Sequence, residues 1–213
     1  DIHFDWRLAV ESVYAGVDKV RINPGNIGEE SHVREVARVC REKNIPIRIG
    51  VNSGSLEKDI LSRYGSATPE AMVESGFYHI SLLEKYDFDN IVLSLKSSDQ
   101  KRIYDAYVLT DKKCKYPLHL GVTEAGTENM GVIKSAAGIG GLLLRGIGDT
   151  VRISLTDDPV REVYAAQKLL KALGIRKGGI KFVSCPTCGR TAIDLIGLAK
   201  QAEKRFENID KDI

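Results

Sequence analysis

The sequence repeats one unit, in which a short run of β-branched residues is followed by a polar turn and then by an amphipathic helix. Strands are expected at 1–4, 19–23, 46–52, 90–97, 117–124 and 150–156. Helices are expected between them, at 6–15, 32–42, from 69 onward, 101–108, 129–137 and 159–173. Strands that alternate with helices at this spacing are joined by right-handed crossovers and lie parallel in one sheet. The chain is therefore predicted to be an α/β protein.

Two architectures fit this order of elements, the doubly wound sheet and the TIM-type (β/α) barrel. Polar residues follow the carboxyl ends of nearly all the predicted strands, which is where a barrel carries its active site. A doubly wound sheet instead concentrates its site at one switch point. The barrel is therefore favoured. Six of the eight units that a barrel needs are visible, so we expect the barrel to be incomplete at its N-terminus.

The composition changes after Gly174, and this change predicts two domains. Residues 1–175 are expected to be the barrel portion. The glycine-rich stretch 176–179 is expected to be a linker, followed by a seventh strand at 180–184 and a helix at 192–206. Residues 176–213 are therefore predicted to begin a small α+β domain that is cut short at Ile213.

Composition excludes several classes of protein. A formal net charge of +2 over 213 residues gives no field that would attract nucleic acid or a membrane surface. No apolar run approaches the roughly 20 residues that cross a bilayer. Four cysteines are too few for a disulfide scaffold. A cytoplasmic enzyme that binds neither nucleic acid nor a membrane is expected.

Four cations are predicted to gather on one face of the sheet, at the mouth of the barrel. Residues two apart in a strand point to the same face, and the opposite face of each strand is apolar. The cations on the polar face are Arg21, Arg48, Lys96 and Arg152. The same face carries Asn23, Asn52 and Ser154. A phosphate or diphosphate would relieve the mutual repulsion of the cations, because guanidinium groups bind its oxygens in pairs. The alternative is that each cation pairs with a neighbouring carboxylate.

Other polar residues at strand ends are candidates for the same site. Glu124 suits a charge stabiliser or a proton relay, and it could instead pair with an arginine. Asp1 and Glu124 together could neutralise only two of the four cations. His3, on the same face as Asp1, could donate a hydrogen bond to a substrate oxygen. No role is assigned to the remaining histidines, His32, His79 and His119.

Cys185 and Cys188 form a Cys-x-x-Cys pair at the end of the seventh predicted strand. Such a pair can hold part of an iron–sulfur cluster, hold half of a zinc site, or act as a dithiol. Cys40 and Cys114 lie in the predicted barrel portion, far away in the sequence, and are expected to be small buried apolar residues. A metal or cluster would thus need ligands that the sequence does not obviously supply.

Seven segments together resemble the 4-hydroxy-3-methylbut-2-enyl diphosphate synthases. These segments are DIHF at 1–4, RINPGNIG at 21–28, RIGVNSGS at 48–55, SLKSS at 94–98, GVTEAG at 121–126, RISLT at 152–156 and SCPTCGR at 184–190. The resemblance runs in collinear order over essentially the whole chain. It implies that the chain is a fragment lacking both ends and is inactive by itself.

The resemblance implies a TIM barrel followed by a small domain with a [4Fe–4S] cluster. The family opens 2-C-methyl-D-erythritol 2,4-cyclodiphosphate reductively and removes water, in isoprenoid biosynthesis, with two electrons from flavodoxin or ferredoxin. Its bacterial members are homodimers. Three cysteines and a glutamate hold the cluster; Cys185 and Cys188 match the first two, and the other ligands are expected beyond Ile213.

The resemblance also implies a role for each residue at the strand ends. The diphosphate would be held by Arg21, Arg48, Lys96, Arg152, Asn23, Asn52 and Ser154. Glu124 would relay protons during dehydration, and Asp1 and His3 would complete the mouth. Two alternatives remain: a non-redox phosphate-binding barrel, either a lyase such as an aldolase or an isomerase, with a zinc-stabilised tail, and a non-catalytic anion-binding module.

Overall fold

The computed structural model describes residues 1–2, 4–23, 26–178, 180, 182–206 and 209. The chain divides into two compact units, Asp1–Ala166 and Gln167–Ile213. The boundary between them falls inside helix α7 (Pro159–Ala172). None of the helices in the described part of the chain is both long enough and apolar enough to span a bilayer.

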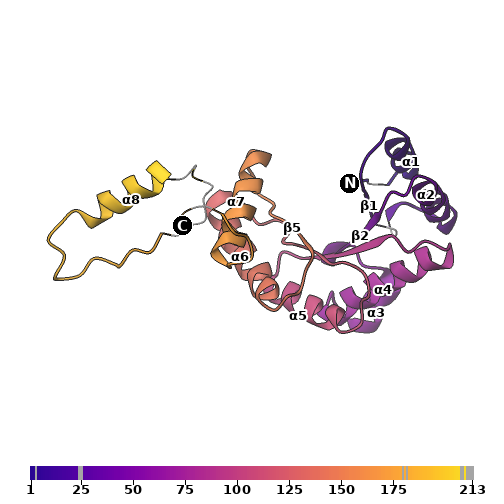
Figure 1. Cartoon of the computed structure of the whole chain (residues 1–213). Coiled ribbons are helices and arrows are strands. Elements are labelled where there is room, and N and C mark those ends of the chain that lie inside the picture. The colour runs from indigo at the N-terminus through magenta and orange to yellow at the C-terminus, as the bar shows by residue number, and fades with distance from the viewer. Residues whose placement is uncertain (3, 24–25, 179, 181, 207–208, 210–213) are drawn as a thin grey trace. The chain divides into compact units, whose positions relative to one another are not determined.

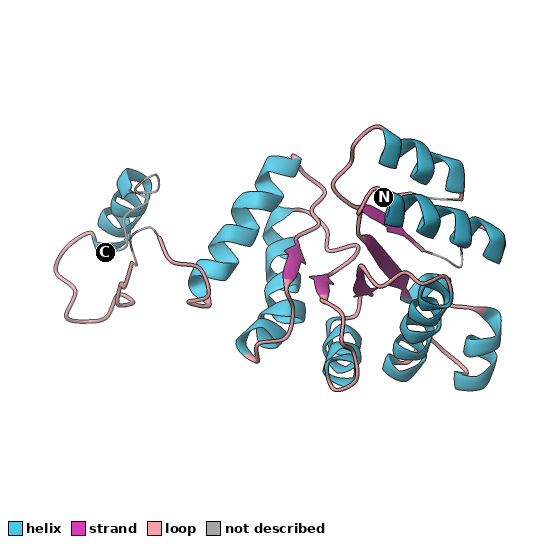
Figure 2. Ribbon diagram, turned by 45° about the vertical axis from the view of Figure 1, so that its right-hand side comes forward, coloured by secondary structure: helices cyan, strands magenta, loops and turns pink. Residues whose placement is uncertain are grey.

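Parallel strands form the centre of the first unit (Figures 1 and 2). Strands β1 (Val20–Ile22), β2 (Ile47–Asn52) and β3 (Ile91–Lys96) form a three-stranded sheet in that order. Strands β4 (His119–Gly121) and β5 (Thr150–Arg152) form a two-stranded sheet. All of these pairings are parallel, as the alternation of strands and helices predicts. The α/β class is therefore confirmed.

A tyrosine side chain helps to join the two sheets. They meet at a parallel bridge between Leu93 and Leu118. Next to it, the fully buried Tyr107 accepts a hydrogen bond from the Leu95 amide at 2.9 Å and donates one to the His119 carbonyl at 2.6 Å. The phenol thus pairs with one buried backbone group of β3 and one of β4, and buried backbone groups need such partners. It also holds β4 beside β3, which positions the polar face of both strands.

Helices lie between the strands along the chain. In the described residues they are α1 (Trp6–Tyr14), α2 (Glu30–Glu42), α3 (Lys58–Tyr64), α4 (Pro69–Lys85), α5 (Gln100–Asp111), α6 (Glu128–Leu144), α7 (Pro159–Ala172) and α8 (Leu195–Phe206). The start of α4 is as predicted: Pro69 is the first helical residue, and the Thr68 hydroxyl accepts a hydrogen bond from the Ala71 amide at 3.2 Å. Gly174, with φ +71°, follows the end of α7, as expected of a C-terminal cap.

The apolar face of the strands packs against the helices, as the sequence pattern predicts. Helix α4 packs on β2 and β3, and Gly76 brings its backbone so close that an added Cβ would lie 3.2 Å from Leu93 and 3.3 Å from Leu95. Ile22, Ile49 and Leu93 are fully buried on this face. The polar residues of the same strands are thereby left on the opposite face.

Two expectations about strands differ from the structure. The described residues of the segment 1–4 are not assigned to a strand, although the Ile2 amide donates a hydrogen bond to the Arg21 carbonyl at 2.9 Å. Residues 180 and 182–184 form no strand, because no neighbouring strand pairs with them. The described strands do not close into a barrel, since β5 pairs only with β4, and this does not conflict with the expectation of an incomplete barrel. Helix α3 was not expected, and it ends at Gly65 with φ +72°.

Candidate functional site

The structure brings the four predicted cations together on the polar face of the strands. Arg21 on β1 lies opposite Arg48 on β2, and Arg152 lies on β5. Lys96, at the end of β3, lies opposite Asn52. Arg21 and Lys96 are buried, with 6% and 7% of their surface exposed. Buried cations are rare unless paired, so this cluster requires a source of negative charge.

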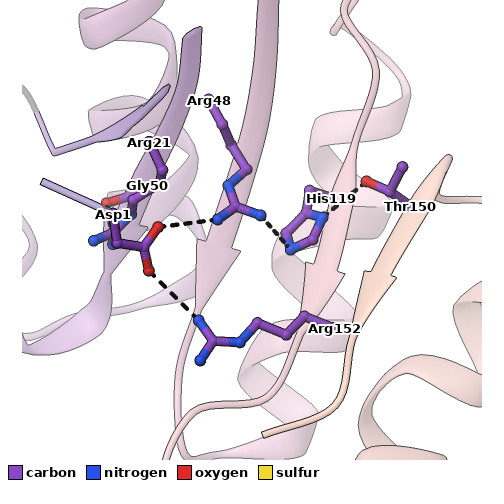
Figure 3. Close-up of polar contacts among 7 residues, drawn as sticks. All are labelled: Asp1, Arg21, Arg48, Gly50, His119, Thr150 and Arg152. Atoms are coloured by element: carbon purple, nitrogen blue, oxygen red, sulfur yellow. Dashed lines mark hydrogen bonds and ion pairs between the residues drawn. The ribbon is translucent and has the colours of Figure 1, made fainter. Parts of the chain in front are cut away.

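One carboxylate bridges two of the cations (Figure 3). Oδ1 of Asp1 lies 3.1 Å from Nη2 of Arg48, and Oδ2 of Asp1 lies 3.5 Å from Nη1 of Arg152. Within the described residues, no other carboxylate pairs with the four cations. The alternative in which each cation has its own carboxylate therefore does not hold for the described residues. Positive charge remains in excess at this site.

Gly50 makes room for the guanidinium of Arg21. Arg21 Nη2 donates a hydrogen bond to the Gly50 carbonyl at 3.2 Å. A Cβ at Gly50 would lie 2.6 Å from Arg21 Nη2 and 2.7 Å from Cζ, and closer still to Nε. Arg21 can therefore lie flat across β2 only because residue 50 has no side chain. Burial, followed by the charges of Arg48 and Arg152, lowers the pKa of Arg21.

Lys96 is the most strongly perturbed of the four cations. Burial first, and then the charges of Arg152, Arg48 and Arg21, lower the pKa of Lys96 to about 8. Its ammonium group makes no ion pair with any of the described residues. An amine in this position is partly deprotonated near neutral pH, and an incoming anion would favour its charged form.

His119 also belongs to this site, although the spacing of the histidines in the sequence assigns no role to it. It is buried on β4, with Nε2 at 2.7 Å from Arg48 Nη1 and Nδ1 at 2.8 Å from Thr150 Oγ1 (Figure 3). Burial, and then the charge of Arg48, lower the pKa of His119 to about 3. The alternation rule would have found it. Gly121 lies opposite Arg152, and His119, two residues earlier, therefore lies on the same face.

Hydrogen bonds tie the strand ends together beside the cations. Nδ2 of the buried Asn23 donates to Ser55 Oγ at 3.1 Å, in the 3₁₀ turn Ser53–Ser55. Ser53 Oγ donates to Ser97 Oγ at 3.2 Å, across the ends of β2 and β3. Asn52 and Ser154 are half-buried, and Ser154 lies just beyond β5. His3, the remaining predicted member, lies outside the described residues.

Glu124 follows β4 in a left-handed backbone conformation. Its φ is +55°, which is uncommon for a residue other than glycine or asparagine, and its side chain is exposed. It makes no ion pair with an arginine among the described residues. The interpretation of Glu124 as an ion-pair partner is therefore not supported. Backbone strain of this kind is often found at functional positions.

The cysteine pair lies in the second unit, where both thiols are free and exposed. The Thr191 hydroxyl accepts a hydrogen bond from the Cys188 amide at 3.0 Å. A hydrogen bond from the Arg190 backbone, followed by one from Thr191, lowers the pKa of the Cys188 thiol. In the described part of the chain, no three histidine, cysteine or acidic residues come together as a metal site. Cys40 is fully buried, as expected, and Cys114 is half-buried.

Comparison with known families adds a second line of observation. Residues 1–167 match the sequence model of the family described as the GcpE TIM-barrel domain. The match contains the whole cation cluster and Glu124, and it ends before the cysteine pair.

Curated proteins resemble the whole chain. Proteins from Clostridium perfringens and Clostridium acetobutylicum are 56% and 57% identical over 213 residues, which is 100% of this chain and 61% of each relative. A protein from Fusobacterium nucleatum is 58% identical over 206 residues, 97% of this chain and 58% of the relative. All three are named 4-hydroxy-3-methylbut-2-en-1-yl diphosphate synthase (flavodoxin). The chain therefore spans about three fifths of the length of these relatives.

Proposed function

The chain belongs to the GcpE TIM-barrel family, and from this premise we propose that its complete protein makes 4-hydroxy-3-methylbut-2-enyl diphosphate. The proposed substrate is 2-C-methyl-D-erythritol 2,4-cyclodiphosphate, and the pathway is isoprenoid biosynthesis. The reaction needs two electrons, for which the names of the relatives favour flavodoxin as donor, with ferredoxin as the alternative. The described strands would be part of a TIM barrel that the rest of the protein closes.

The excess of positive charge at the strand ends is the observation that carries this proposal. Four cations face one bridging carboxylate, and two of these cations are buried. A cyclic diphosphate carries the negative charge that this arrangement lacks, with several oxygens for guanidinium groups. The proposed diphosphate-binding residues are Arg21, Arg48, Lys96, Arg152, Asn23, Asn52 and Ser154. Asp1 would orient two of the arginines, and His3 would complete the mouth.

The proposed reaction conserves atoms and electrons, and it requires only simple roles of the side chains. One carbon–oxygen bond of the ring breaks and frees a terminal phosphate, a hydroxyl leaves as water, and two electrons and two protons are consumed. The cations would stabilise the phosphate charge released when the ring opens. Glu124, exposed and without an ion-pair partner among the described residues, would give a proton to the leaving hydroxyl.

Cys185 and Cys188 fit two ligand positions of an iron–sulfur cluster. Their thiols are free and exposed, two residues separate them, and thiolates are the usual ligands of such clusters. A [4Fe–4S] cluster, when bound, would supply electrons to the substrate. The other ligands would come from residues outside this chain. A homodimer, in which the cluster domain of one subunit covers the barrel of the other, and a cytoplasmic location complete the proposal.

Iron and acid-labile sulfide in the complete protein, purified without oxygen, test the proposal. We expect about four of each per chain, because a cubane cluster contains four iron and four sulfide ions. Zinc without sulfide would overturn the reductive mechanism. It would favour the alternative, a non-redox phosphate-binding lyase or isomerase with a zinc-stabilised tail.

Anion affinity is expected to fall as the pH rises past about 8, the pKa of Lys96. An anion binds the ammonium form and raises its pKa, so affinity falls by up to about tenfold per pH unit between the pKa of free Lys96 and that of the complex. Isothermal titration of the complete protein with inorganic pyrophosphate, between pH 6.5 and pH 10, would measure this dependence.

Lys96→Met is the control for this pH profile, because pyrophosphate itself titrates in the same range. The ratio of wild-type affinity to Lys96→Met affinity removes the contribution of the ligand. We expect this ratio to be largest below pH 8 and to shrink above it. A ratio that does not change with pH would contradict a direct contact between Lys96 and the anion.

A further inference from the structure

Arg48 is held by two different acceptors, one on each terminal nitrogen. Nη2 donates to a carboxylate oxygen of Asp1 at 3.1 Å, and Nη1 donates to Nε2 of His119 at 2.7 Å. The two contacts approach the guanidinium from opposite sides (Figure 3). Because the guanidinium is planar, two acceptors on separate nitrogens fix the plane as well as the position of the group.

The hydrogen bonds of His119 define which of its nitrogens carries the proton. Arginine can only donate, so Nε2 must accept and carries no hydrogen. Nδ1 then carries the hydrogen of the neutral ring and donates to Thr150 Oγ1 at 2.8 Å. Tyr107 donates to the His119 carbonyl at 2.6 Å and so anchors the backbone beneath the ring. The imidazole is thus fixed from β5, from α5 and by Arg48.

A neutral acceptor differs from a carboxylate in its effect on the charge of the site. A second carboxylate on Arg48 would hold the guanidinium equally well, but it would cancel the positive charge that an anion needs. A neutral imidazole orients Arg48 and leaves that charge intact. Burial first, and then the positive charges of Arg48, Lys96, Lys19 and Arg152, lower the pKa of His119 and so keep the ring from becoming charged itself.

We propose that His119 is a positioning residue for anion binding, which holds Arg48 in its binding orientation through a neutral Nδ1–H imidazole fixed by Thr150. This inference rests on the proposed function, since it takes the diphosphate as the ligand of Arg48. It assigns a role to a residue that touches the arginine and not the substrate.

The tautomer can be measured directly in the wild-type complete protein. Labelling histidine with ¹⁵N and recording long-range proton–nitrogen spectra distinguishes a protonated ring nitrogen from an unprotonated one. The chain has four histidines, and the signal that is lost in His119→Gln identifies this one. We expect protonated Nδ1 and unprotonated Nε2 at pH 7. A proton on Nε2 would overturn the inference.

Two variants distinguish a role of His119 in positioning Arg48 from a role in packing alone. In His119→Gln, the carboxamide reaches the place of Nε2 and can still accept from Arg48. In His119→Asn, it reaches only the place of Nδ1, near Thr150. Pyrophosphate affinity, measured by isothermal titration, is expected to stay within about threefold of wild type for Gln and to fall at least about tenfold for Asn.

His79→Gln is the matched control, because His79 is also buried but lies on α4, paired with Glu57. It is expected to lower Tm without changing pyrophosphate affinity. Equal pyrophosphate affinities of the Gln and Asn variants of His119 would overturn the positioning role. Losses of affinity that are merely proportional to the decrease in Tm would overturn it as well. If wild-type protein does not bind pyrophosphate, the proposed anion site fails, and the tautomer measurement still decides whether His119 holds Arg48 as inferred.

Discussion

Replacement of Glu124 by glutamine in the complete protein is expected to lower turnover of the cyclic diphosphate about a thousandfold. Loss of a positioned acid or base typically costs between a hundredfold and ten-thousandfold. The amide has the same shape as the carboxyl group, but it cannot give a proton to the leaving hydroxyl. Diphosphate affinity should stay within about tenfold, or about 1.4 kcal/mol, because the four cations remain in place. Steady-state turnover and isothermal titration measure the two effects separately.

Glu128→Gln is the control for this prediction. Glu128 is an exposed glutamate in the first turn of α6, four residues after Glu124. The substitution removes the negative charge and with it a favourable interaction with the helix dipole, which costs at most about 1 kcal/mol of stability. Turnover is expected to be unchanged in this variant. Normal turnover in Glu124→Gln would exclude the proton-relay role of Glu124.

Replacement of Gly50 by alanine is expected to weaken pyrophosphate binding about thirtyfold, comparable to the loss of a hydrogen-bonded charged group. The new Cβ would occupy the space of the Arg21 guanidinium, 2.6 Å from Nη2. Arg21 is buried between its neighbours, so either its side chain or the backbone of β2 must move. Overpacking of this kind also costs about 1–3 kcal/mol of stability. Calorimetric titration and thermal unfolding would measure both effects.

Gly54→Ala provides the comparison, because an added Cβ at Gly54 meets no atom within 4 Å. Gly54 lies in the neighbouring 3₁₀ turn and is exposed. This variant should bind pyrophosphate as wild type does, with little change in Tm. Equal binding by Gly50→Ala and Gly54→Ala would contradict the packing of Arg21 against Gly50.

The sequence was sufficient to predict the α/β class, because periodicity is a local property. The runs at 46–52 and 90–97 became β2 and β3, and the Thr68–Pro69 pair begins α4 as expected. The gathering of Arg21, Arg48, Lys96 and Arg152 on one face also followed from alternation alone. In a parallel sheet, side chains at the same register position of adjacent strands point to the same face. The alternation within each strand therefore predicts which side chains of different strands lie next to one another.

The sequence is a weaker guide to whether a short segment pairs with another strand. The stretch 180–184 has the composition of a strand, but a strand needs a partner, and the described residues offer none there. No strand is described at 1–2 or at residue 4, although the Ile2 amide donates a hydrogen bond to the Arg21 carbonyl of β1. Helix α3 was missed because it is short and lies directly after a turn.

The sequence predicts the set of charged residues on one face of a parallel sheet and their excess over nearby carboxylates. The way in which those charged groups are held depends on the tertiary structure. Asp1 bridges Arg48 and Arg152, and His119 accepts from Arg48 through a tautomer that Thr150 selects. These contacts join residues up to 151 positions apart. They depend on distances between strands, which the spacing of residues along one strand does not contain.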